Sequence, residues 1–331
     1  TLSGGSLTLG HTGSTGLRLL LSAVVLLPPT FAMGGSLPAM ARAIELDSDH
    51  SRRVLGWAYA INTLGAVAGA ALTTFFLLER LGNRSSLYAA CGLNALVGAL
   101  AYAYGKTRAQ AVLPEEPATA SEPAGPAMFV YASAAVVGFA FFLMELVWYR
   151  MLGPLLGGSV FTFGLILAVA LAGIGTGSAL YALFSVPRTR LLITFAATCA
   201  LEALCIVAPY ALGDRLAMAS LFLQPFAAFG FGGQVLGWVV IALVVVFPAA
   251  LLSGFQFPLL IALLGQGRAQ VARDVGRAYA ANTLGAIAGA LAGGFGLLPA
   301  LGALGAWRAI GVLLGVWSLF AAGVALLRAP E

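Results

Sequence analysis

Charged side chains are scarce in this chain and make up only 9% of its 331 residues, against about 25% in an ordinary soluble domain. Hydrophobic residues account for 60% of the chain, and the mean hydropathy is +0.97. This composition excludes both a soluble globular protein and a disordered one. Apolar runs longer than about 18 residues recur along the whole sequence, which is typical of transmembrane helices.

The residues that most often build catalytic or metal sites are also few. Lys106 is the single lysine, and the chain has two histidines and three cysteines, none of which shows metal-ligand spacing. A basic stripe with interleaved aromatics, a nucleophile elbow and a phosphate-binding loop are all absent from the sequence. The sequence therefore indicates no metal, no cofactor, no nucleic-acid partner and no catalytic domain within this chain.

The apolar runs predict nine transmembrane helices and an all-α, polytopic membrane bundle. Strands of a membrane barrel would need only about 10 residues with strict alternation, which these runs do not show. The predicted crossings are 17–40, 56–78, 86–104, 128–148, 160–184, 191–212, 235–260, 276–298 and 307–327.

Basic residues between the runs predict the orientation of these helices. With the N-terminus outside, eleven lysines and arginines fall on the inner side and six on the outer side. Because positive charge is retained in the cytoplasm, we expect the C-terminus to be cytoplasmic. A composition heavy in alanine, glycine and arginine, with a single lysine, is typical of a high-GC bacterial gene, so we expect this membrane to be a bacterial inner membrane. The inner set is Arg42, Arg52, Arg53, Lys106, Arg108, Arg188, Arg190, Arg268, Arg273, Arg277 and Arg328, and the outer set is Arg18, Arg80, Arg84, Arg150, Arg215 and Arg308.

An internal repeat with an offset of 220 residues is the strongest signal. Residues 53–70 and 273–290 are identical at 13 of 18 positions, and Gly34 and Pro38 match Gly254 and Pro258 without a gap. Six predicted crossings separate the two copies. Because six is an even number, both copies must face the same way, so the repeat is parallel rather than inverted.

The repeat also predicts the domain organisation. Residues 128–331 form a complete six-helix unit, and residues 1–104 form the second half of an equivalent unit that is truncated. Residues 105–127 are rich in proline and glutamate, as in a solvated cytoplasmic linker. Three further helices ahead of Thr1 would complete a protein of twelve crossings.

Each repeated helix carries one asparagine and a pair of glycines four residues apart. Asn62 with Gly65 and Gly69, and Asn282 with Gly285 and Gly289, share one helical face. The glycines predict close helix packing, as does the cluster at 173, 175 and 177. The two amides either bond between helices or line a central cavity in which a substrate binds.

Proline and acidic residues mark further candidate positions inside the apolar runs. Pro28 and Pro248 occupy matching places, where a kink, a helix end or a broken transport helix is expected. Glu145 lies near the outer end of its run and either pairs with an arginine or binds a cation. Glu202 is central in its run, where a carboxylate costs about 2.5–3.5 kcal/mol to insert, so it must be protonated, paired or facing water.

These acids are the main candidates for solute binding. With Asn62 and Asn282, they form the predicted substrate-binding set. Gln234 and Gln256 are the weaker polar candidates and are expected to form hydrogen bonds within the bundle.

Three segments resemble a known family in combination. They are Leu26–Pro38, the Tyr-Ala-x-Asn-Thr-Leu-Gly-Ala stretches at 59–66 and 279–286, and residues 142–161. They resemble the membrane region of bacterial spermidine-synthase-like integral membrane proteins, the fused major-facilitator/spermidine-synthase family. That resemblance implies a cytoplasmic aminopropyltransferase-like domain after the helices. No residue for such activity lies in this chain.

Two functions are consistent with these features. The first is a transporter-like domain that handles polyamines or another small cationic solute and works with a spermidine-synthase-like partner. The second is a structural subunit that anchors such a domain or packs within a larger membrane complex, with lipids as its other partners. An intramembrane enzyme would need a paired catalytic constellation that the sequence lacks.

Overall fold

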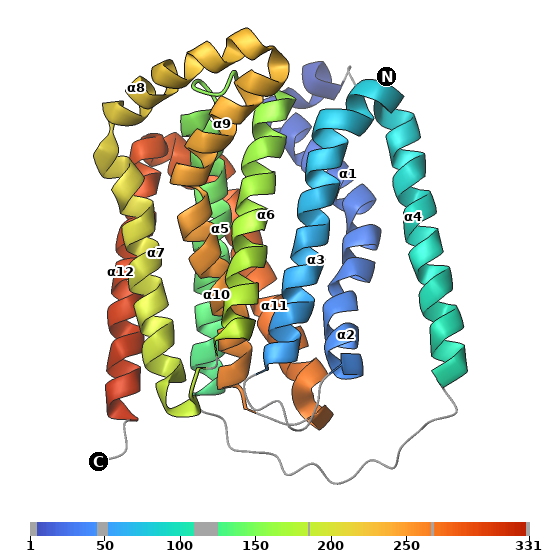
Figure 1. Ribbon diagram of the computed structural model, residues 1–331, viewed down its shortest axis with the longest axis vertical. Coiled ribbons are helices and arrows are strands. Elements are labelled where there is room, and N and C mark those ends of the chain that lie inside the picture. Colours follow the sequence, from blue (N-terminus) through green and yellow to red (C-terminus); the bar gives the residue numbers. More distant parts are fainter. Residues whose placement is uncertain (1–4, 45–51, 109–124, 185, 266–267, 329–331) are drawn as a thin grey trace.

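The computed structural model describes residues 5–44, 52–108, 125–184, 186–265 and 268–328. Within these ranges the chain is almost wholly helical and has no strand, which confirms the predicted all-α bundle (Figure 1). The α-helices are α1 (Gly5–Gly34), α2 (Ser36–Ile44), α3 (Arg53–Leu72), α4 (Leu78–Arg108), α5 (Ala127–Leu152), α6 (Val160–Leu183), α7 (Leu191–Leu212), α8 (Asp214–Leu223), α9 (Phe231–Val245), α10 (Phe247–Leu263), α11 (Arg268–Leu291) and α12 (Leu298–Leu327).

The described helices account for the nine predicted crossings. Six stretches are long and apolar enough to span a membrane, and α9 with α10 forms a seventh, bent by 54°. Two stretches run for 54 and 57 residues, and such a helix would be about 80 Å long, more than twice the hydrocarbon thickness of a bilayer. Each is instead a hairpin of two crossings that turns back near Gly82 or Gly302 (Figure 1).

The two copies of the repeat run in the same direction. Arg52, directly before α3, donates a hydrogen bond from Nη2 to the carbonyl oxygen of Gly265, shortly before α11, at 3.0 Å. Both helices therefore begin at one end of the bundle, and Figure 1 shows both running to the other end. This arrangement confirms the parallel repeat.

Backbone irregularities recur in both copies. Gly82 and Gly302 adopt φ 70° and 69°, and Gly10 and Gly230 adopt φ 67° and 81°, each pair being 220 residues apart. Other residues rarely tolerate such positive φ values. A single wide π-helical turn precedes the hairpin glycine in each copy, at Thr73–Leu77 (η2) and Ala292–Leu297 (η5).

Two predicted crossings, 17–40 and 235–260, are each divided between two helices. Residues 235–260 divide between α9 and α10 at Val246, and Pro248 lies in the first turn of α10. Proline suits that position because its missing N–H would have no partner there. In the first copy the matching proline, Pro28, lies inside α1, and the helix ends instead at Gly34. The linker predicted at 105–127 lies largely outside the described residues.

Helix α10 is the centre of the second unit. It packs against α5, α6, α7 and α9, and most of its side chains are buried. A Cβ atom at Gly177 of α6 would overlap the backbone oxygen of Leu251, and one at Gly254 of α10 would overlap that of Ile174. The two helices therefore touch backbone to backbone, as the glycine cluster predicted.

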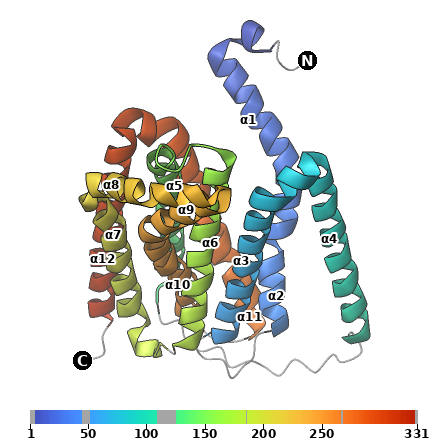
Figure 2. The same ribbon diagram turned by 45° about the horizontal axis from the view of Figure 1, so that its top comes forward.

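Two helices of the first unit are only loosely covered. Apolar side chains on α1, such as Val25 and Phe31, are exposed, and so are Leu87 and Tyr102 on α4. Figures 1 and 2 both show α4 set apart from the bundle, and Figure 2 shows the first half of α1 projecting beyond it.

The contact between α6 and α10 predicts a marked cost for even one added methyl group. Gly177→Ala should lower the free energy of unfolding by about 1–3 kcal/mol, because neither backbone can move away within a close-packed bundle. Gly315→Ala is the matched control, since a Cβ atom there meets nothing within 4 Å. Thermal unfolding in detergent, followed by circular dichroism, measures both. Equal stability of the two variants would contradict the backbone contact.

Candidate functional site

Glu202 lies deep inside the bundle on α7. Only 1% of its surface is exposed, although its neighbour Leu201 faces outward. Its α7 neighbours on either side belong to two separate apolar clusters. Cys199 belongs to the cluster towards the end that holds the C-terminus, and Ala203 belongs to the cluster towards the opposite end. The carboxyl group is therefore near the middle of the membrane-spanning region.

Gln256 of α10 is the hydrogen-bond partner of Glu202. Its Nε2 atom donates to Oε2 of Glu202 at 2.8 Å and lies 3.8 Å from the Cys199 sulfur. Gln256 is fully buried, and its Oε1 atom accepts no hydrogen bond from the described residues. The expectation that Gln256 bonds within the bundle is confirmed, and its partner is the central acid.

Helix α12 fixes α7 on both sides of this pair. Trp307 donates from Nε1 to the carbonyl oxygen of Ile206 at 2.8 Å, and Ser318 donates from Oγ to that of Ala196 at 2.9 Å. The first bond lies about one turn after Glu202 and the second nearly two turns before it. The acid is thus presented to α10 by a helix that is itself held in place.

The surroundings of Glu202 determine its chemistry. Within the described ranges no arginine or lysine forms an ion pair with it, and a carboxylate without a counter-charge is costly in an apolar interior. A protonated carboxyl group has an O–H to donate, and Oε1 of Gln256 is an acceptor on the same amide that already bonds to it. The pair therefore accommodates a neutral acid, and loss of the proton would create an isolated negative charge.

Glu145 lies elsewhere, near the end of α5. It is half-buried. Tyr149, one turn further on, packs its ring against Phe163 with centroids 5.7 Å apart. Both roles left open for Glu145, the arginine pair and the cation site, stay predictions.

The repeated asparagines are not brought together. Asn282 is half-buried against Gly138 of α5, whereas Asn62 is exposed on α3. Because α3 packs mainly on α6 and α11 mainly on α5, the four predicted substrate-binding residues occupy separate places.

The repeated glycines also differ between the copies. A Cβ atom at Gly285 would overlap the backbone of Ala135, and one at Gly289 would overlap that of Phe139, so this pair packs as predicted. Gly65 and Gly69 meet nothing within 4 Å. The predicted packing role is thus realised in one copy only.

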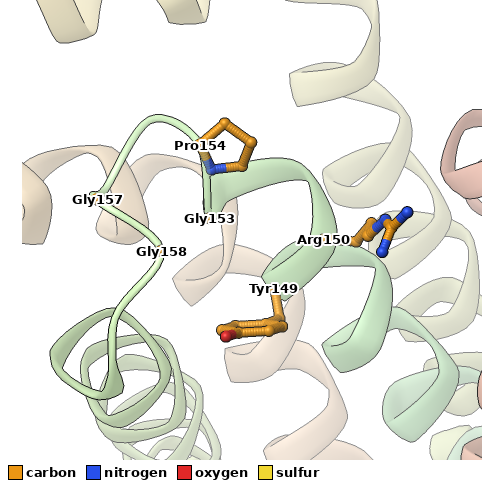
Figure 3. A pocket seen from close by; sticks show the side chains of 6 residues that line it. All are labelled: Tyr149, Arg150, Gly153, Pro154, Gly157 and Gly158. Atoms are coloured by element: carbon orange, nitrogen blue, oxygen red, sulfur yellow. The ribbon is translucent and has the colours of Figure 1, made fainter.

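Two pockets of about 500 Å³ and 480 Å³ adjoin each other at the end of the bundle near α8. Figure 3 shows the first, with Tyr149 on the last turn of α5 and the loop at Gly157 and Gly158 beside it, while Arg150 projects away from that loop. The second shares Pro154 and Gly157 with it and extends to Gln234. Glu202 lines neither pocket.

Arg52 and Arg53, predicted from the sequence to set the topology or to bind lipid headgroups, also form hydrogen bonds within the bundle. Arg52 bonds to the carbonyl oxygen of Gly265, and Arg53 donates from Nε to that of Ala182 at 2.7 Å. Both bonds join the first unit to the second. Sequence reasoning had no signal for them, because their acceptors are backbone atoms 129 and 213 residues away.

Comparison of the chain with protein-family models, curated proteins and solved structures finds no match in any of the three. The residues and their geometry therefore carry the functional argument alone.

The pairing of Glu202 with Gln256 predicts a non-additive effect on stability. Gln256→Leu alone should cost about 1–3 kcal/mol, because it leaves a buried carboxyl group without its donor. The double variant Glu202→Leu with Gln256→Leu should recover most of that loss, since both polar groups are then replaced by apolar ones. Thermal unfolding of the two variants measures both stabilities, and a double variant no more stable than Gln256→Leu would mean that the two side chains do not act as a pair.

Proposed function

We propose that this chain is a transporter-like membrane domain that handles a small cationic solute, with Glu202 as the solute's counter-charge. One observation carries the proposal: an acidic side chain is kept near the middle of the membrane with an amide as its hydrogen-bond partner. Ionisable groups at that depth are costly and are typical of ion and substrate pathways.

The surroundings of Glu202 are consistent with a closed state of such a site. The hydrogen bond from Gln256 occupies the carboxyl group when no solute is bound. An ammonium group of the solute would replace this donor and pair with the ionised carboxylate. Gln256 belongs to a helix that follows a 54° bend, and bent or broken helices are common in transporters.

The class of solute follows from the carboxyl group of the site, which becomes negatively charged when it loses its proton. A polyamine fits a carboxylate and is consistent with the family resemblance, which also implies delivery to or from a spermidine-synthase-like domain. We propose a bacterial inner membrane, in line with the composition and the family resemblance, and a C-terminus in the cytoplasm, as the distribution of arginines predicts.

A second function, that of a structural subunit, is favoured by a different observation. Apolar side chains cover the outward faces of α1 and α4, and broad apolar faces also suit contact with other membrane subunits. In this case Glu202 and Gln256 would act only as a hydrogen-bonded pair that fixes α7 against α10.

Transport measurements separate the two functions. The wild-type protein in liposomes should accumulate radiolabelled spermidine, and Glu202→Gln should reduce the initial rate at least tenfold, about the effect of losing 1.4 kcal/mol of interaction. Glu79→Gln is the matched control because Glu79 is an exposed acid on α4, and it should transport normally.

Two results would argue against transport. The first is no uptake of spermidine or putrescine by the wild-type protein, and the second is an unchanged rate in Glu202→Gln. Either would favour the structural role.

A further inference from the structure

The repeated helix has two opposite faces that can contact other helices. At 100° per residue, Gly56, Ala60 and Thr63 of α3 lie on one face, and Gly65 and Gly69 lie on the other. Helix α11 carries the same two faces 220 residues later. In this structure each copy has a different face covered.

The face of α3 that carries Gly56 is covered by α6. A Cβ atom at Gly56 would lie 3.2 Å from that of Ala182, and Ser178 donates from Oγ to the carbonyl oxygen of Gly56 at 2.9 Å. Arg53 adds a further hydrogen bond to this contact, from its Nε atom to the carbonyl oxygen of Ala182.

Among the described residues no helix covers the matching face of α11 as α6 covers that of α3. Only its first part meets α2, where a Cβ atom at Gly276 would lie 3.8 Å from Cγ of Pro38. Ala280 and Thr283 are exposed, Leu284 is 67% exposed, and Arg273, which corresponds to Arg53, extends into the open. This face of α11 carries the same residue pattern as the face of α3 on which α6 packs.

The opposite face shows the reverse situation. On α11, α5 packs so closely that a side chain at Gly285 or Gly289 would overlap its backbone. On α3, Gly65 and Gly69 face open space.

The last helices of the two copies differ in the same way. Trp307, Ile310 and Ser318 of α12 are buried in its contact with α7 and the helices around it. The corresponding residues of α4, Leu87, Ala90 and Gly98, are exposed. Helix α4 therefore lacks the equivalent of α7.

We propose that these three exposed faces together form the docking surface for one partner, a three-helix transmembrane unit of the same type as α5–α7. Its first helix would pack on Gly65 and Gly69, its second on the Leu284 face of α11, and its third on α4. The observed contacts α5·α11, α6·α3 and α7·α12 supply the geometry for each. The proposal does not depend on transport.

The observed contacts of α5 and α6 also indicate which residues this partner must contain. Its first helix needs small residues, as at Ala135 and Gly138, so that its backbone can approach the two glycines. Its second helix must end with a free carbonyl group near Arg273. A second copy of this chain does not fit, because its own α5–α7 already contact α10, α11 and α12.

Matched leucine substitutions test the surface in two settings. In the purified chain, Gly285→Leu should lower the melting temperature by about 5 °C or more, and Gly65→Leu should leave it unchanged. In native membranes, both variants should lower it. Ala68→Leu is the control, because Ala68 and its counterpart Ala288 are exposed in both copies and lie between the two faces.

Photo-crosslinking in native membranes provides a measurement that does not depend on stability. Benzoylphenylalanine in place of Leu284 or Leu87 should form adducts with helices of one and the same three-helix unit, identified by mass spectrometry. The same group in place of Ala68 should give no protein adduct.

Three outcomes would overturn the proposal. One is a native-membrane melting temperature that Gly65→Leu does not change. Another is adducts at positions 284 and 87 with lipid alone. The third is adducts with peptides of this chain, together with loss of a dimer in Gly65→Leu, which would identify a second copy as the occupant.

Discussion

Direct backbone contact between α6 and α10 is the constraint on which the second unit depends. Gly173, Gly177 and Gly254 remove the side chains that would hold the two helices apart. Helix α10 can then lie at the centre and touch α5, α7 and α9 as well. In a bilayer the hydrophobic effect does not drive helices together, so such close packing has to supply much of the stabilisation.

The central position of α10 gives Gln256 its role. A fully buried amide needs partners, and α7 offers one from Glu202. The result is a polar pair between two apolar clusters, with one amide oxygen left over. A pair with only a structural role would be more stable if all its polar atoms were hydrogen-bonded, or if both side chains were apolar. The amide oxygen of Gln256 without a donor is therefore consistent with a site that also exists in another protonation or ligand state.

The internal repeat gives the described bundle two copies of the same local structure with different neighbours. The repeated helix packs against α6 in the first copy, as α3, and against α5 in the second, as α11. The chain turns back at the equivalent hairpin glycine in both copies. What differs is the set of neighbours. Within the described residues the first unit lacks counterparts of α5–α7, and the faces that would receive them remain apolar and exposed.

The sequence by itself determined the helical class, the number of crossings and the direction of the repeat. These properties depend on run length, on composition and on a fixed offset, all of which are local or periodic features of the chain. It also identified Glu202 as the acid with the greatest cost of burial. Only the tertiary structure decided that Gln256 is its partner, that Asn62 and Asn282 lie apart, and that the glycine pairs pack in one copy only. Those outcomes depend on which distant helices become neighbours, and a hydrogen bond across 54 residues or a carbonyl oxygen that accepts from Arg53 leaves no pattern in the sequence.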